Sequence, residues 1–144
     1  MKLLFFHDLL PKVGLRNGYD RPIGNEDNGW IGNLGEIVEY SFESAQEISE
    51  LRFVFDSNLN RHLHNMSCNY PLEQNDFHVP ESLVKEFKIQ ALSKFGNWDP
   101  VIEVKNNYQR LVKLKVNVKT KAIRFIPVST WGSEKAHVFS WDLR

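Results

Sequence analysis

The chain has 144 residues, of which 42% are hydrophobic and 25% are charged, and its formal net charge at pH 7 is zero. A chain of this length can fold as one domain that buries roughly 68–70% of its unfolded surface, so it needs no metal or disulfide for stability. The balanced charge gives no reason to expect a nucleic acid or an anionic membrane as a partner. The single cysteine, Cys68, excludes an intrachain disulfide. No apolar run approaches the roughly 18–20 residues of a transmembrane helix.

Residues 1–14 form an apolar segment that precedes the predicted domain, residues 15–144. The apolar run Leu3–Phe6 ends at His7, well short of the about 7–15 apolar residues that an export signal needs. We therefore predict no export signal, and the localisation stays open. A turn at Asn17–Gly18 begins a long loop, after which we expect Trp30 to cover the core instead of forming a ligand platform.

Alternating apolar and polar residues predict strands at residues 36–42 and 48–56, separated by a turn at residues 43–47. Residues 57–83 then form a long polar connection with Pro71 and Pro80. Because unstructured loops longer than about 12–15 residues are usually functional or disordered, this connection is a candidate site.

Further alternation predicts strands at residues 86–91, 98–104, 112–118, 123–125 and 139–143, with a turn at residues 119–121. Seven or eight short strands without a convincing helix predict an all-β, antiparallel jelly-roll β-sandwich. The predicted core consists of Phe53, Phe55, Phe87, Ile89, Val112, Leu114, Val116, Phe125, Phe139 and Trp141.

Several motifs occur in a characteristic order along residues 15–144: Asn17–Pro22, Trp30, Phe53–Asn60, Pro80–Phe87, Gly96–Trp98 and Asn106–Arg110. Together they resemble the C-terminal module of bacterial FAD-dependent oxidoreductase-like proteins, a galactose-binding-domain-like, or discoidin-like, β-sandwich. The resemblance implies a non-catalytic accessory module whose partner is either a flavin-containing catalytic domain or a carbohydrate ligand.

Two features bear on cofactors. The glycine-rich turn that holds a flavin dinucleotide is absent from the sequence, so we predict no cofactor in this chain. Discoidin-like domains often carry a calcium ion near their termini, held partly by an acidic residue of the last strand. The aligned residue here is Ser140, which argues against calcium.

Two alternatives concern metals and polyanions. His62, His64, Cys68 and His78 could form a metal site, and the segment 62–78 could then serve a stand-alone metal-assisted enzyme. The set lacks a Cys-x-x-Cys pair, and we interpret its histidines as solvated loop residues. Residues 105–124 contain seven basic residues and no acid, which we interpret as solvent-facing strand lysines instead of a polyanion site.

The run Asn106–Arg110 has two interpretations that the sequence does not separate. Its amides, phenol and guanidinium could bind sugar hydroxyls or a carboxylate, or they could bind loop carbonyls of the chain itself. Since loops at the ends of a sandwich collect recognition residues, we predict that ligand-binding residues lie in the loops. They are Arg21, Asn25, Asp27, Arg61, His62, Tyr108, Arg110 and Trp131.

Overall fold

The computed structural model describes residues 15–22, 28–58 and 79–144. These residues form one antiparallel sheet in the strand order β1-β6-β2-β5-β3-β4. In the described part of the chain, no helix has the length and apolar character to cross a membrane. The strands are β1 (Trp30–Asn33), β2 (Val38–Phe55), β3 (Val84–Leu92), β4 (Trp98–Val104), β5 (Leu111–Thr130) and β6 (Lys135–Leu143).

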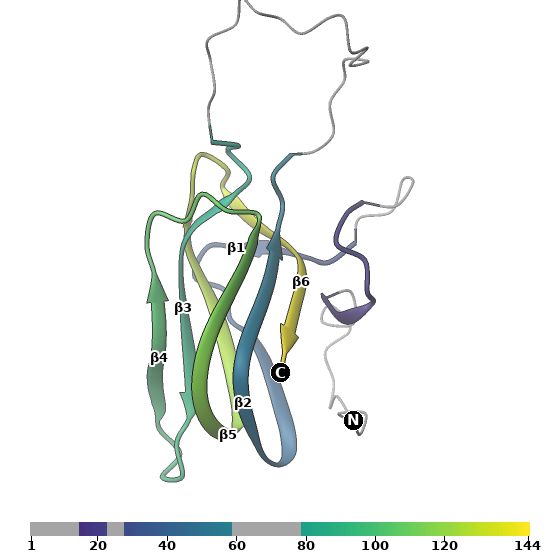
Figure 1. Cartoon of the computed structure of the whole chain (residues 1–144). Coiled ribbons are helices and arrows are strands. Elements are labelled where there is room, and N and C mark those ends of the chain that lie inside the picture. The colour runs from purple at the N-terminus through teal and green to yellow at the C-terminus, as the bar shows by residue number, and fades with distance from the viewer. Residues whose placement is uncertain (1–14, 23–27, 59–78) are drawn as a thin grey trace, which may run out of the picture.

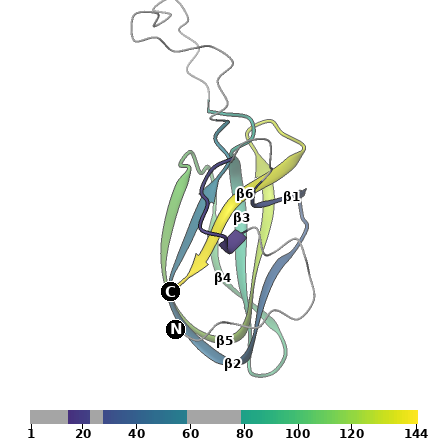
Figure 2. The same ribbon diagram turned by 90° about the vertical axis from the view of Figure 1, so that its right-hand side faces the viewer.

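The two longest strands, β2 and β5, bend together at the lower end of the molecule, so that the sheet folds over itself into two layers (Figures 1 and 2). The second part of β2 lies beside β6 in one layer, and the second part of β5 lies beside β3 in the other. The chain is thus an all-β antiparallel sandwich, as predicted from the alternating sequence.

The turns predicted at residues 43–47 and 119–121 are wrong, because both strands continue through the bend. The pairing of β2 with β5 shifts register between Ser41 and Gln46 instead of ending there. On β5, the Thr120 hydroxyl donates a hydrogen bond of 2.9 Å to the Leu92 carbonyl oxygen, which fastens the bend to β3. The described residues therefore form six strands, where the sequence predicted seven or eight along the chain.

Aromatic rings from both layers form the centre of the core. The Phe53 ring centroid lies 5.3 Å from that of Phe87, 5.2 Å from that of Phe125 and 5.5 Å from that of Trp141. All four side chains are buried. Trp30 is also buried in this cluster and meets Phe125 edge-on, which confirms its predicted role as a cover of the core.

Two of the predicted core residues, Leu114 and Val116, are only half-buried, whereas the other eight are buried. Both lie on the first half of β5, which pairs with β2 on one side and, among the described residues, has no partner strand on the other. The described strands leave this side uncovered, and the two side chains therefore remain partly accessible.

Candidate functional site

The end of the sandwich opposite the bend is formed by residues 56–58, 79–83, 105–110 and 131–134, which we call the loop end (Figure 1). There β2 ends, β3 begins, β4 ends, β5 both begins and ends, and β6 begins. Loops from distant parts of the sequence are therefore held side by side on a rigid scaffold, which is the usual setting of a recognition site.

Asn107 fixes the segment between β4 and β5. Its side-chain amide donates to the carbonyl oxygens of Val84 at 2.9 Å and Gln109 at 3.0 Å, and its backbone amide donates to Lys85 at 2.8 Å. Asn106 just before it has a φ of 54°, a left-handed conformation that asparagine tolerates better than most residues. The fixed loop presents Tyr108 to solvent with 72% of its surface exposed.

Trp131 lies next to this loop. Its indole N–H donates to the Asn107 carbonyl oxygen at 2.7 Å, and its backbone amide donates to Leu83 at 3.1 Å. The indole remains 36% exposed, and the Lys85 ammonium lies 4.8 Å from its centroid. A Cβ atom on Gly132 would lie 2.8 Å from Glu81 Cγ, so a larger residue after the tryptophan would have to displace the Glu81 side chain. The Asn107 carbonyl, directly before Tyr108, thus ties the loop of Trp131 to the loop that carries the exposed Tyr108.

A polar cluster beneath the loops joins three segments. His137 Nδ1 lies 3.0 Å from an Asp56 carboxylate oxygen, and Nε2 lies 2.9 Å from the carbonyl oxygen of Asn28. Both ring nitrogens face acceptors, an arrangement that suits the doubly protonated imidazolium. Burial raises the pKa of the Asp56 carboxyl, but the hydrogen bonds from His137 and from the Asn58 amide outweigh it and hold that pKa below its ordinary value.

Arg110 is directed into this polar layer. Its guanidinium donates to the Asp20 carbonyl oxygen and, at 3.2 Å, to the Ser57 hydroxyl, and it lies 5.3 Å from the Phe139 ring centroid. The side chain is half-buried and joins residue 20 to the start of β5. These contacts favour the structural interpretation of Arg110, while the exposed Tyr108 keeps the recognition interpretation open for the same run.

We expect that Arg110→Ala lowers the free energy of unfolding by about 1–3 kcal/mol, because two half-buried acceptors lose a charged donor. Affinity for a sugar ligand should change by less than about threefold, which is under about 0.7 kcal/mol. Denaturant unfolding and calorimetric titration measure the two quantities. Lys121→Ala, at an exposed lysine of β5 outside the loop end, is the control. Unchanged stability with lost affinity would restore Arg110 as a ligand-binding residue.

The structure brings Tyr108, Arg110 and Trp131 to the loop end, and Arg21 follows Asp20, whose carbonyl oxygen accepts a hydrogen bond from Arg110. The Asn28 side chain donates to the Arg21 carbonyl oxygen at 3.2 Å, and the Asn28 carbonyl is the one that faces His137. The remaining predicted site residues, Asn25, Asp27, Arg61 and His62, lie outside the described residues, as do His64, Cys68 and His78. In the described ranges, no group of three His, Cys, Asp or Glu residues could hold a metal ion.

Sequence reasoning missed Lys85 and His137 as members of this site. Lys85 reaches the indole because Val84 pairs with Thr130 across β3 and β5. The His137 side chain reaches the Asp56 carboxylate because the Asp56 backbone amide donates to the His137 carbonyl oxygen at 3.1 Å. Both contacts depend on the register between strands, and no local sequence signal specifies it.

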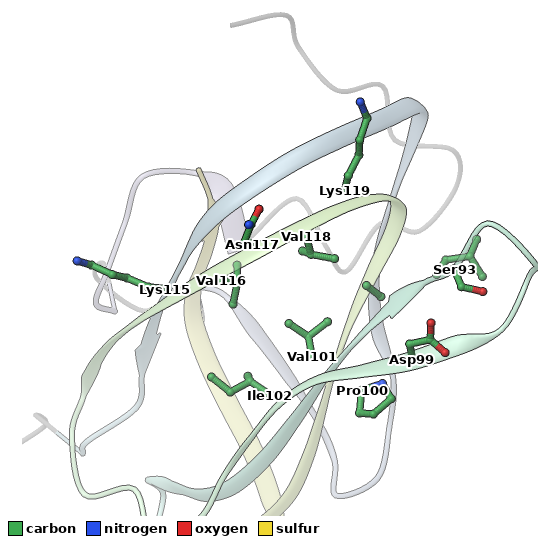
Figure 3. A pocket seen from close by; sticks show the side chains of 12 residues that line it. Ser93, Asp99, Pro100, Val101, Ile102, Lys115, Val116, Asn117, Val118 and Lys119 are labelled. Carbon is green, nitrogen blue, oxygen red and sulfur yellow. The ribbon is translucent and has the colours of Figure 1, made fainter.

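A separate pocket of about 380 Å³ opens on the unpaired side of the sandwich, between β4 and the first half of β5. Figure 3 shows Val101 and Ile102 directed toward Val116 and Val118, while Lys115 and Lys119 point away. Its lining contains no aromatic ring, so this pocket lacks the flat apolar surface on which a sugar ring stacks. The lysines of β5 are exposed in alternation with half-buried valines, as expected of solvent-facing strand residues.

No family model matches the sequence, and no curated protein matches it. Solved structures do resemble the fold. The family 32 carbohydrate-binding module of EndoD from Streptococcus pneumoniae has a TM-score of 0.68 at 13% identity, covering 97% of this chain and 90% of that one. The family 32 module of NanJ from C. perfringens, in complex with galactose, has a TM-score of 0.61 at 11% identity, covering 92% and 82%.

The family 32 module of AlyQ, in complex with 4,5-unsaturated mannuronic acid, has a TM-score of 0.61 at 11% identity, covering 99% of this chain and 92% of that one. At these identities the likeness shows the fold alone, which is the galactose-binding-like β-sandwich that the sequence resemblance implied. None of the three structures is described as part of a flavin oxidoreductase, so the flavin-containing partner stays a prediction without support from them.

Proposed function

We propose that this chain is a non-catalytic carbohydrate-binding module whose sugar site is the loop end. The observation that carries the proposal is that two exposed aromatic residues, Tyr108 and Trp131, lie on adjoining loops that the hydrogen bond from the Trp131 indole to the Asn107 carbonyl joins. The apolar face of a pyranose ring packs on such rings, and amide or hydroxyl groups around them bind its hydroxyl groups. Structures with the same fold are named as carbohydrate-binding modules, two of them in complex with sugars.

We infer that the site binds a ligand and does not catalyse a reaction. The carboxylate and imidazole that lie closest to one another, Asp56 and His137, have side chains only 22% and 14% exposed, and they hold a third segment through Asn28. They therefore serve to keep the loops in place. A rigid surface is favourable for a weak ligand such as a sugar, because little conformational entropy is lost when it binds.

We expect that Trp131→Ala weakens sugar binding by about tenfold or more, as the loss of a central aromatic contact usually does. A glycan panel followed by calorimetric titration with the best neutral sugar, beginning with galactose, measures the effect. Tyr108→Ala should weaken binding in the same direction.

The chain offers a matched control in Trp98 at the start of β4. It is half-exposed, and the Arg124 guanidinium lies 4.2 Å from its ring centroid, so it reproduces the tryptophan–cation pair at the opposite end of the molecule. Trp98→Ala should leave affinity unchanged. Loss of binding in Trp98→Ala but not in Trp131→Ala would move the site to that end, and no binding to any glycan would reject the function.

A further inference from the structure

Lys85 has an environment that the binding of a neutral sugar does not explain. Its ammonium lies 4.8 Å from the Trp131 ring centroid, and no carboxylate of the described residues lies within 4.0 Å of it. By contrast, Lys88 and Lys105 lie 3.9 and 3.8 Å from Glu103. Lys85 is half-buried and is the second residue of β3. The strand and the indole together therefore restrict where its charge can lie.

We propose that the loop-end site selects acidic sugars, with Lys85 binding the carboxylate of a uronic acid whose ring packs on the neighbouring aromatic side chains. This inference rests on the proposed function and adds the chemical class of the ligand. A cation held at a π surface is already partly desolvated. A carboxylate beside it therefore forms a charge-assisted hydrogen bond, about twice as strong as the bond that a neutral sugar hydroxyl makes.

One carboxylate opposes this selection. The Glu81 side chain lies against Gly132, directly after Trp131, since its Cγ, Cβ and Cδ atoms are the neighbours that a Cβ on Gly132 would meet. Among the described residues, Glu81 makes no ion pair with Lys85 within 4.0 Å, so it does not neutralise that ammonium. Lys85 should attract an acidic ligand and Glu81 should repel it, which gives two substitutions with opposite expected effects.

The test uses the full chain and two matched probes, trigalacturonate and α-1,4-linked galactotriose, which differ in carrying C6 as a carboxylate or as a hydroxymethyl group. The measured quantity is the ratio of their affinities by calorimetric titration. We expect a ratio of about ten in favour of the acid at low salt, falling as salt screens the charges.

Lys85→Gln should reduce this ratio to about one, Lys85→Arg should largely preserve it, and Glu81→Gln should raise it about twofold or more. Lys115→Gln is the control, because Lys115 is exposed on β5, outside the loop end, and points away from the pocket between β4 and β5 (Figure 3). Melting temperatures of all variants show whether they are folded.

The outcomes separate the two proposals. If Trp131→Ala abolishes binding of both probes while Lys85→Gln leaves the ratio unchanged, the carbohydrate site stands and the role of Lys85 is wrong. A wild-type ratio near one has the same meaning. If neither probe binds and no other glycan does, the proposed function itself fails, and the inference fails with it.

Discussion

Replacing Phe53 with alanine is expected to lower the free energy of unfolding by about 3–5 kcal/mol, the range for deletion of a large aromatic side chain from a rigid core. Phe53 has no exposed surface, and its ring lies 5.2–5.6 Å from four other rings. These rings come from β2, β3, β5 and β6, so the cavity would separate the two layers and could not close by a local shift. Because native domains are stable by about 5–15 kcal/mol, we expect this loss to remove a large part of the total stability of the chain.

Urea unfolding followed by tryptophan fluorescence measures this change. Leu111→Ala serves as the control, since Leu111 is a large apolar residue at the start of β5 with 46% of its surface exposed. Its replacement should change stability by about 0.5 kcal/mol or less. A loss under about 1 kcal/mol for Phe53→Ala would show that the ring cluster does not form the centre of the core.

Phe53 also shows how far the sequence could specify this fold. Alternation around it predicted a strand that turns Leu51, Phe53 and Phe55 to the core, and this is confirmed. Val54 on the opposite face is buried as well, which the alternation did not predict. The bend at residues 42–46 could not be distinguished from a turn. Its side chains are mostly exposed, so they show the same polar composition that a true turn would have, while the backbone pairing continues across a register shift.

The candidate site shows the same division. The position of Tyr108 and Trp131 at the loop end could be predicted. Each is an aromatic residue among polar turn residues, and loops between antiparallel strands gather at the ends of a sandwich. The inward direction of Arg110 could not be predicted, because a guanidinium serves equally well as a ligand-binding group and as a donor to backbone carbonyls. Its actual partner, Asp20, is distant in sequence, and no periodicity links the two.

The outer face of β2 carries a charge network in which Arg52 is central. Its Nη2 lies 2.6 Å from an Asp20 carboxylate oxygen, and its Nη1 lies 2.9 Å from Asp142. Ser140, the residue that argued against calcium, donates to the same Asp142 oxygen at 3.1 Å. A guanidinium therefore already bridges the two carboxylates, and we expect that EDTA leaves the melting temperature of the chain unchanged.

Arg52→Met is expected to lower the free energy of unfolding by about 2 kcal/mol. The hydrogen bond with Asp20 is the main reason that the pKa of Arg52 lies above its ordinary value, and hydrogen bonds to charged groups contribute about 1.5–3 kcal/mol when broken on one side. The cost is below that of a fully buried pair, because the Asp20 and Asp142 side chains are 42% and 36% exposed and can regain water.

The matched control is Lys113→Met. Lys113 pairs with Arg52 across β5 and β2, it is exposed, and it makes no ion pair with the described residues. Its replacement should change stability by about 0.5 kcal/mol or less, and a double-mutant cycle of Arg52→Met with Asp142→Asn should give a coupling energy of about 1 kcal/mol. Equal effects of the two methionine variants would mean that the network is surface charge without structural value. A larger loss for Arg52→Met would instead show that this guanidinium fastens residues 15–22, and with them the buried Leu15, to the sheet.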